Sequence, residues 1–363
     1  MKILIIRLSS IGDCVLASPV LEALRERYPD AHITWAVQAK SAPVVQGLPG
    51  LSESLLWDKQ NNSYWRSLLP ILKKVRREKF DVALDLQGID KAGAMALASG
   101  AKRRITGTSS HRLAKWSSNE RVPEAGLLHA RLFYLRRAAA LDIAPDSAER
   151  FFPRLPMTDE HRNFATQFLQ QANVESSHRL VGINLGASGP KKRWPATRFA
   201  QLAQRVLSSD ARARIIVFGA KADLPLWESF QEELASENKS THSMQESRIL
   251  NGVGTLNLLQ MAAMAERCSA FVTADTGPMH IAAAVGAPVL ALCGPVNVHR
   301  TGPVRNPDGA PIRILDARDI TGSWPAPMSV LDVDRVFDEV MQLIEEAETF
   351  HEQSDKLSRA LGA

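Results

Sequence analysis

The sequence predicts an α/β protein with two domains, each built on a mostly parallel β-sheet. Three observations support this prediction. Short apolar runs alternate with amphipathic stretches along nearly the whole chain, as is typical of repeated strand–helix–strand units. The chain has 363 residues, more than one ordinary hydrophobic core accommodates. Two prolines within residues 151–156 mark a crossing between the halves.

The first half contains four predicted strands, at residues 2–7, 32–37, 81–86 and 104–106. Between the first two strands, apolar residues recur at helical spacing from Leu16 to Tyr28, and Pro29 and Asp30 end this helix. The segment 65–80 combines apolar and basic residues as a basic amphipathic helix. Such a helix can lie on an anionic leaflet, or it can pack its apolar face on the sheet as an ordinary surface helix.

The second half repeats the pattern with four more predicted strands, at residues 179–185, 214–218, 270–274 and 289–293. Helices are predicted around them at residues 158–172, 196–207, 224–236 and 256–267. A long amphipathic helix is predicted at residues 333–350. We therefore predict domains at residues 1–155 and 156–328, and a C-terminal helix within residues 329–363 that packs back across the cleft between them.

Composition and charge narrow the classes of protein. Lys and Arg outnumber Asp and Glu by 44 to 39, a net charge of +5 that suits an anionic ligand or membrane surface. Cys14, Cys268 and Cys293 are far apart, which argues against a disulfide framework or a zinc site. The apolar start at residues 1–7 is too short for a signal peptide, and no run approaches the roughly 18 apolar residues of a membrane span. These features predict a cytoplasmic protein.

Two common phosphate-binding motifs are absent. The glycine-rich dinucleotide fingerprint would follow the first strand, but Ser9-Ser10-Ile11-Gly12 stands there. Gly252-Val253-Gly254 matches it in part, with Asn257 in place of the third glycine. The P-loop pattern is also missing. A dinucleotide-dependent dehydrogenase and a P-loop nucleotidase are therefore disfavoured.

The stretch Asp275-Thr276-Gly277-Pro278-Met279-His280 has the form of an anion site. A predicted strand ends at Asp275, a turn passes through Gly277, and Pro278 opens a helix over residues 279–285 that stops at Gly286. A helix N-terminus at the carboxyl end of a strand offers free backbone N–H groups and a positive dipole end. Alone, the same pattern equally fits an ordinary strand–helix turn capped by Thr276.

Two other strand ends carry candidate residues. Residues 181–195 leave a strand, enter a small-residue loop around Ser188, and reach the cations Lys191-Lys192-Arg193, which suits a phosphate. Residues 9–13 join the first strand to the first helix, at the edge that faces the ligand crevice in α/β sheets. Asp13 is therefore placed either as a general base or as a partner of the helix N-terminus.

In combination, these segments resemble the ADP-heptose lipopolysaccharide heptosyltransferases of glycosyltransferase family 9. The resemblance covers nearly the whole chain. It rests, in order, on residues 6–16, Asp85-Leu86-Gln87-Gly88, Lys192-Arg193-Trp194-Pro195, residues 275–280 and Gly294-Pro295.

The resemblance implies a GT-B fold, in which two Rossmann-like domains with parallel sheets face a central cleft. The first domain would bind the acceptor and the second the nucleotide sugar. The implied reaction is an inverting, metal-independent and cofactor-free transfer of heptose from ADP-heptose to the phosphorylated, acidic inner core of lipopolysaccharide. The enzyme is expected in the cytoplasm, where it could make peripheral contact with the anionic cytoplasmic face of the inner membrane. Nucleic acid is not an expected partner.

The resemblance also implies residue roles. Asp13 matches the catalytic base, and Lys192 matches a ligand of the donor phosphate that stabilises the leaving group. The implied donor-binding residues are Ser188, Lys192, Lys221, Leu256, Asp275, Thr276, Gly277 and His280. The implied acceptor-binding residues are Ser10, Gly12, Lys59, Arg66, Gln87 and Arg112, with Lys91, Arg103, Arg104 and Lys115 as further basic candidates.

Three positions depart from the family pattern. Lys221 stands where an acidic residue is usual, Leu256 where a methionine is common, and Val296 where a threonine is expected. These positions concern the nucleoside pocket, so the base and sugar of the donor stay open. A family relative with another sugar donor or a protein acceptor is one alternative. A nucleotide-sugar epimerase and a non-catalytic sugar-nucleotide or lipopolysaccharide-binding protein are two more.

Overall fold

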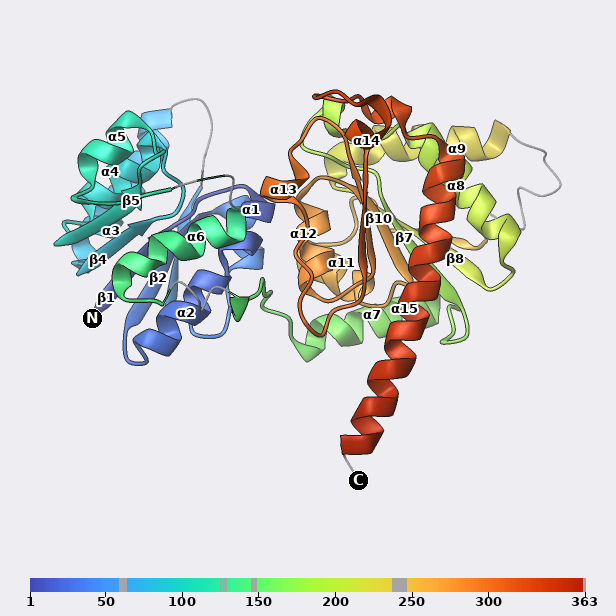
Figure 1. Ribbon diagram of the computed structural model, residues 1–363, viewed down its shortest axis with the longest axis horizontal. Helices are drawn as coiled ribbons and strands as arrows, with labels where there is room; N and C mark the ends of the chain where they lie inside the picture. The colour runs from blue at the N-terminus through green and yellow to red at the C-terminus, as the bar shows by residue number, and fades with distance from the viewer. Residues whose placement is uncertain (59–63, 125, 127–128, 145–148, 237–246, 362–363) are drawn as a thin grey trace. The chain divides into compact units, whose positions relative to one another are not determined.

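The computed structural model describes residues 1–58, 64–124, 126, 129–144, 149–236 and 247–361. The chain divides into two compact units (Figure 1). The first comprises residues 1–156 and 299–301, and the second comprises residues 157–298 and 302–363. Each unit contains one parallel β-sheet with helices on both faces (Figure 1).

The first unit contains a six-stranded parallel sheet in the order β3-β2-β1-β4-β5-β6. Its strands are β1 (Lys2–Ile6), β2 (His32–Gln38), β3 (Glu53–Trp57), β4 (Val82–Asp85), β5 (Arg103–Gly107) and β6 (Glu120–Val122). The four predicted strands are confirmed. The two missed strands, β3 and β6, are the edges of the sheet. Their residues are half-exposed and partly charged, so they lack the continuous apolar run of a strand buried on both faces.

The helices of the first unit are α1 (Ile11–Ala17), α2 (Pro19–Arg27), α3 (Tyr64–Glu78), α4 (Asp90–Ala98), α5 (Arg112–Ser117) and α6 (Ala130–Ala138). Short 3-10 helices lie at Ala39–Val44 and Ala139–Leu141. The prediction of one helix between the first two strands was wrong. The run divides at Ser18 because Pro19 has no N–H to continue the first helix and instead opens the second.

The second unit contains another six-stranded parallel sheet, in the order β12-β11-β10-β7-β8-β9. Its strands are β7 (Arg179–Asn184), β8 (Ala213–Phe218), β9 (Ile249–Asn251), β10 (Ala270–Ala274), β11 (Val289–Cys293) and β12 (Ile312–Asp316). The four predicted strands are again the central ones. If the strands of each sheet are numbered from 1 in chain order, both sheets have the Rossmann order 3-2-1-4-5-6. The order reverses between β1 and β4 in one sheet and between β7 and β10 in the other, where ligands bind in such folds.

The helices of the second unit surround its sheet (Figure 1). They are α7 (Asp159–Gln171), α8 (Ala196–Ser209), α9 (Leu224–Ser236), α11 (Leu258–Ala265), α12 (Gly277–Ala284), α14 (Ala317–Thr321) and α15 (Val333–Leu361). The short helix α13 (Val298–Thr301) has residues in both units, and 3-10 turns lie at Pro190–Lys192, Lys221–Asp223 and Met328–Val330.

The final helix α15 is longer than predicted. It packs on α8 and on the strands β10, β11 and β12, and it places Val336, Val340, Leu343 and Ile344 in the core of its own unit. This apolar stripe explains why the segment forms a helix that docks on the sheet. Its predicted crossing of a cleft stays a prediction.

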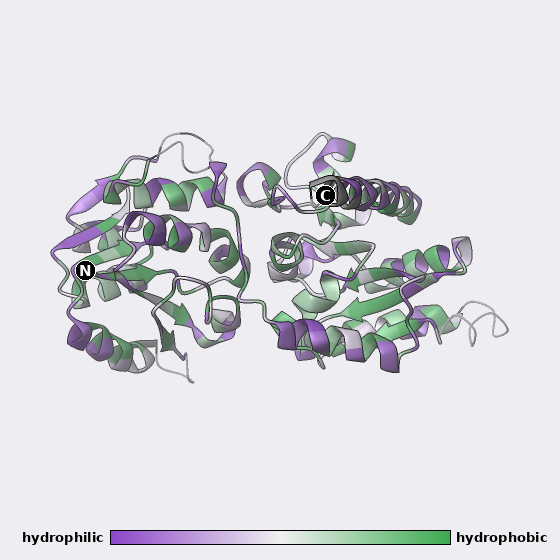
Figure 2. Ribbon diagram, turned by 90° about the horizontal axis from the view of Figure 1, so that it is seen from below, coloured by the Kyte–Doolittle hydropathy of each residue, from purple (hydrophilic) through white to green (hydrophobic). Residues whose placement is uncertain are grey.

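The hydrophobic residues of both units gather in the strands, and the outer helix faces are polar (Figure 2). Strands β1, β4, β10 and β11 are almost wholly buried, as parallel strands covered by helices on both faces must be. The polar loops at their carboxyl ends are therefore held by a rigid apolar frame.

Candidate active site

The predicted catalytic and phosphate-binding residues lie at the two places where strand order reverses. In the first unit, residues 7–13 follow β1. Asp85 ends β4, its neighbour in the sheet, and residues 86–88 follow that strand. In the second unit, residues 185–192 follow β7 and residues 275–280 follow β10, again its neighbour. Because the strands are parallel, their carboxyl ends meet at one edge of each sheet.

Asp13 stands in the first turn of α1 and has a dense set of partners. Its Oδ2 accepts hydrogen bonds from the backbone N–H and the hydroxyl of Ser10, at 3.2 and 2.8 Å. The guanidinium of Arg7 pairs with the same oxygen at 2.7 Å. The hydroxyl of Tyr134, from α6, donates to Oδ1 at 2.8 Å. Asp13 therefore has the role at the N-terminus of α1 that the sequence left open, since it accepts from the backbone N–H of Ser10. Its side chain is also 29% exposed, so another molecule can reach it.

The charges around Asp13 keep it ionised. Burial works to raise the pKa of Asp13, but the Arg7 guanidinium and the hydrogen bonds from Ser10 and Tyr134 outweigh it and lower the pKa below its usual value. An ionised carboxylate is the form that accepts a proton as a general base. Burial raises the pKa of the neighbouring thiol of Cys14 to about 12, so this group stays protonated and is a poor nucleophile.

Sequence reasoning did not single out Arg7 or Tyr134. Arg7 is 8% exposed, its guanidinium lies 4.9 Å from the centre of the Tyr134 ring, and it donates to the carbonyl of Leu86 at 3.3 Å. Arg7 could have been proposed from the sequence, because it is a cation directly after a buried strand. Tyr134 lies 121 residues from Asp13 and had no comparable local signal.

Gln87 connects the two strand ends of the first unit. Its Oε1 accepts from the N–H of Leu8 at 2.9 Å, and its Nε2 donates to the carbonyl of Ser9 at 3.3 Å. The fully buried carboxylate of Asp85 holds the same loop by accepting from the N–H groups of Gln87 and Gly88, at 2.9 and 2.8 Å. Gln87 thus positions the loop before Asp13, and its predicted contact with the acceptor stays a prediction.

The basic acceptor candidates fall into several groups. Lys59 and the side chain of Arg66 lie outside the described residues, and Arg112 is exposed at the start of α5. Arg103 pairs with Glu120 at 2.7 Å, and Arg104 donates to the carbonyl of Ser117 at 2.7 Å. These two arginines therefore join β5 to the segments beside it.

The remaining predicted acceptor residues lie in the first turn of α1 or near β3. Ser10 is exposed at the N-cap position of α1, whereas Gly12 is buried within the first turn of the helix. Lys91 lies with its amine 4.8 Å from the centre of the Trp57 ring.

In the second unit, Lys192 and Asp275 form an ion pair, with Nζ and Oδ2 separated by 2.6 Å. Lys192 ends the 3-10 turn Pro190–Lys192 after β7, and Asp275 follows β10, so the pair joins the two loops. An ammonium has three N–H donors, and Asp275 uses one of them. The other two N–H donors could bind an anion at this edge of the sheet, because the Lys192 side chain is 32% exposed and an anion can reach it.

The turn after β10 differs from prediction in two details. Helix α12 begins at Gly277 and not at Met279, and the side chain of its N-cap residue Thr276 makes no capping hydrogen bond. The alternative of an ordinary turn capped by the Thr276 hydroxyl is therefore contradicted. The helix still presents its N-terminus at the strand end, with His280 buried in its first turns.

The nucleoside side of the predicted donor site lies along the neighbouring loops. Ser188 and Lys221 are exposed, and Leu256 is half-buried against Gly252. Leu256 precedes α11 and is not part of it as predicted, because the side chain of Asn257 caps the helix by accepting from two backbone N–H groups.

Asp223, two residues after Lys221, accepts from the N–H of Ala220 at 2.9 Å and is buried beside Gly186. It therefore fixes the turn that carries Lys221.

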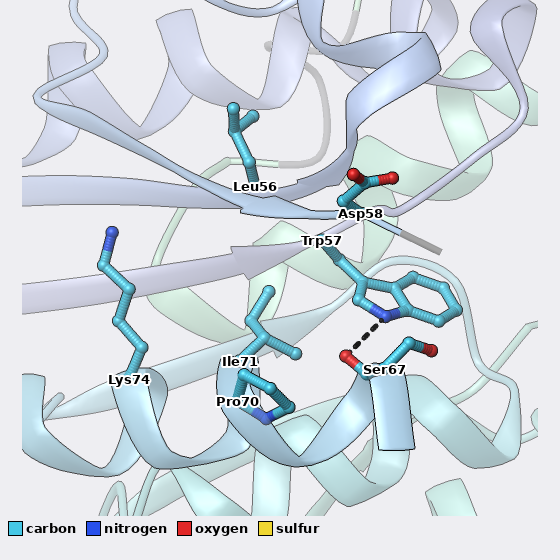
Figure 3. Close-up of a pocket in the computed structure, with 7 residues that line it drawn as sticks. All are labelled: Leu56, Trp57, Asp58, Ser67, Pro70, Ile71 and Lys74. Atoms are coloured by element: carbon cyan, nitrogen blue, oxygen red, sulfur yellow. Dashed lines mark hydrogen bonds between the residues drawn. The ribbon is translucent and has the colours of Figure 1, made fainter. Parts of the chain in front are cut away.

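A separate groove of about 480 Å³ lies between β3 and α3 (Figure 3). In the sheet, β2 separates β3 from β1, the strand that leads to Asp13. It is lined by Leu56, Trp57, Asp58, Ser67, Pro70, Ile71 and Lys74. The indole N–H of Trp57 donates to the carbonyl of Ser67 at 3.1 Å and so ties strand to helix. In the described ranges, no three His, Cys, Asp or Glu side chains come together as a metal site.

Two doubly wound sheets, one with the Asp13 carboxylate and the other with the Lys192–Asp275 ion pair at its switch point, define a protein of the GT-B class. Residues 68–313 match the profile of glycosyltransferase family 9 (heptosyltransferase), so the chain belongs to this family and is a glycosyltransferase. This membership favours transfer over epimerisation.

Individual relatives agree with the family. The chain is 27% identical to lipooligosaccharide heptosyltransferase 2 of Haemophilus ducreyi, over 95% of this chain and 99% of that protein. It is 28% identical to lipopolysaccharide heptosyltransferase 2 of Escherichia coli, over 84% and 86%. The crystal structure of the family 9 glycosyl transferase from Veillonella parvula is similar, with a TM-score of 0.78, 25% identity, and coverage of 95% and 97%.

Proposed function

We propose that this protein transfers heptose from ADP-heptose to the inner core of lipopolysaccharide, with inversion and without a metal ion. The carboxylate of Asp13, ionised and still reachable at the switch point of the first sheet, is the observation that carries the catalytic part of this proposal. The named activities of the relatives support the sugar and the acceptor class. The first unit would bind the acceptor and the second the nucleotide sugar.

The proposed reaction is a single displacement. Asp13 accepts the proton of an acceptor hydroxyl, and the oxygen forms a bond to the anomeric carbon. The bond from that carbon to the diphosphate breaks, and its electron pair leaves with the nucleoside diphosphate. The N–H groups of Lys192 that do not bond to Asp275, the backbone at Thr276 and Gly277, and the ring of His280 would stabilise the growing negative charge.

An assay of ADP release tests this function. With ADP-heptose and a lipopolysaccharide acceptor that lacks the heptose, we expect release of ADP only when the acceptor is present, and no loss of rate in EDTA. UDP- and GDP-hexoses should be poor donors in the same assay. Conversion of the donor sugar without acceptor would instead support an epimerase. Donor binding without any product would support a binding protein, and a rate lost in EDTA and restored by Mg²⁺ would contradict metal independence.

We further propose that the outer face of α3 contacts an anionic membrane surface, where the lipid-linked acceptor is found. Leu68, Ile71 and Val75 of this helix pack into the core of the first unit. The opposite face exposes Leu69 beside basic residues, namely Lys73, Lys74, Arg76 and Arg77. Exposed apolar and basic residues on one helix face suit the headgroup region of an anionic leaflet. In the described part of the chain, no helix is long and apolar enough to cross a bilayer.

Charge reversal on this face should weaken membrane binding. Each basic residue near an anionic surface contributes about 1 kcal/mol, so Lys73→Glu with Arg77→Glu should reduce binding to phosphatidylglycerol vesicles by roughly 30-fold or more. Sedimentation with vesicles measures this, and neutral phosphatidylcholine vesicles should bind neither form. The pair Lys40→Glu with Lys102→Glu changes the net charge equally at exposed positions outside α3. Equal loss in both double variants would contradict a specific role for α3.

A further inference from the structure

The hydrogen bonds to Asp13 are divided unequally between its two oxygens. Oδ2 receives three donors: the guanidinium of Arg7 at 2.7 Å, and the hydroxyl and backbone N–H of Ser10 at 2.8 and 3.2 Å. Oδ1 receives one, the hydroxyl of Tyr134 at 2.8 Å. A carboxylate oxygen has about two lone-pair directions. Among the described residues, Oδ2 is therefore saturated, and Oδ1 retains room for one more donor.

Tyr134 is held firmly in this position. It is 5% exposed, on a helix, α6, that packs against α1 and α2. The Arg7 guanidinium lies over its ring at 4.9 Å, and the ring of Phe133 meets it edge-on at 6.1 Å. Burial, together with the nearby Asp13 carboxylate, raises the pKa of the Tyr134 phenol above its usual value. The phenol therefore stays protonated, and toward an ionised carboxylate it acts as a donor.

We propose that Tyr134 is a positioning residue that orients the Asp13 carboxylate, so that Oδ1 is the atom that receives the proton of the acceptor hydroxyl. Arg7 and Ser10 hold Oδ2 at the same time. This inference rests on the proposed function, in which Asp13 is the base. In the step, the acceptor O–H bond breaks and its proton moves to the free direction of Oδ1. The electron pair left on the acceptor oxygen forms the new bond to the anomeric carbon, and the diphosphate departs with the pair of the broken bond.

The change Tyr134→Phe removes the hydroxyl and keeps the ring beneath Arg7. Hydrogen bonds to charged groups are strong enough that kcat should fall roughly 10- to 100-fold, while KM for the donor stays unchanged because the donor is held by the second unit. The Tyr134 hydrogen bond lowers the pKa of Asp13, so its loss raises that pKa. Turnover requires the ionised form, and the acid limb of the pH profile of kcat should therefore move to higher pH.

The matched control is Tyr28→Phe. Its hydroxyl donates to the carbonyl of Leu141 at 2.9 Å in the same unit and does not bond to Asp13. This variant should keep the wild-type kcat and acid limb. A second test uses site-specific 3-fluorotyrosine at position 134, which keeps the size of the side chain but makes the hydroxyl a stronger donor. It should move the acid limb to lower pH and remains informative even where Tyr134→Phe lowers the thermal midpoint.

Two results would overturn the positioning role. One is an unchanged acid limb in both Tyr134 variants, and the other is the same loss of kcat in Tyr28→Phe as in Tyr134→Phe. Failure of the proposed function has a different signature, since Asp13→Asn would then turn over at the wild-type rate. An inactive Asp13→Asn combined with an unmoved acid limb in the Tyr134 variants would reject the role of Tyr134 alone.

Discussion

Replacement of Asp13 by Asn is expected to lower kcat by roughly 10²- to 10⁴-fold, the usual contribution of a general base. An amide has nearly the shape of a carboxylate but cannot take a proton at neutral pH. It can still accept the capping hydrogen bonds from Ser10 at the start of α1, so we expect the fold to survive. Binding of the donor should remain within a few-fold of the wild type, because its proposed ligands lie in the second unit.

Single-turnover kinetics and donor titration measure these two quantities separately. Asp90→Asn is the matched control, since Asp90 is also an aspartate in the first turn of a helix of the first unit, but it is largely exposed. It should turn over normally. Near-normal turnover of Asp13→Asn would reject Asp13 as the base, and a large loss of donor binding would mean that Asp13 acts on the donor instead.

The second large effect is expected on stability, from Arg137→Met. Arg137 pairs with Glu124 at 2.7 Å, and both side chains are 2% exposed. It also donates to the carbonyl of Asp85 at 2.9 Å. A Cβ at Gly107 would overlap the Glu124 carboxylate, so the glycine allows the buried pair to reach the end of β5. Removal of one partner from a buried ion pair leaves an uncompensated charge and typically costs about 3–5 kcal/mol.

We expect the thermal midpoint of Arg137→Met to fall by roughly 6–20 °C, as measured by scanning calorimetry. Arg150→Met is the matched control, because Arg150 pairs with Glu26 at 2.9 Å but both side chains are more than half exposed. Exposed pairs contribute about 0–1 kcal/mol, so this variant should differ little from the wild type. Similar midpoints for the two variants would show that the buried pair is not needed for stability.

The elements that the sequence predicted well are those that carry a strong local signal. The central strands β1, β4, β7 and β10 are continuous apolar runs, because both of their faces are buried. The edge strands β3, β6, β9 and β12 were missed. Each is short or partly exposed, and its pairing with one neighbour in the sheet is a contact between distant segments that leaves little trace in local composition.

The candidate site shows the same division. Asp13, Lys192 and Asp275 could be proposed from sequence because each follows a strand at the edge where α/β proteins bind ligands. The contacts that they make in the structure could not be predicted from the sequence. The contact of Tyr134 with Asp13 spans 121 residues, and that of Lys192 with Asp275 spans 83. Thr276 matched a capping pattern, yet in the structure its side chain makes no capping bond.

The sequence by itself determined the α/β class, the central strands and the family motifs, because these depend on the periodicity of side chains and on short ordered patterns. Only the tertiary structure decided which oxygen of Asp13 is saturated and which retains room for a donor. That outcome depends on the packing of α6 against α1, which brings the hydroxyl of Tyr134 to one side of the carboxylate while Arg7 holds the other. Hydrogen-bond geometry of this kind is set by three-dimensional packing, and no local pattern in the chain encodes it.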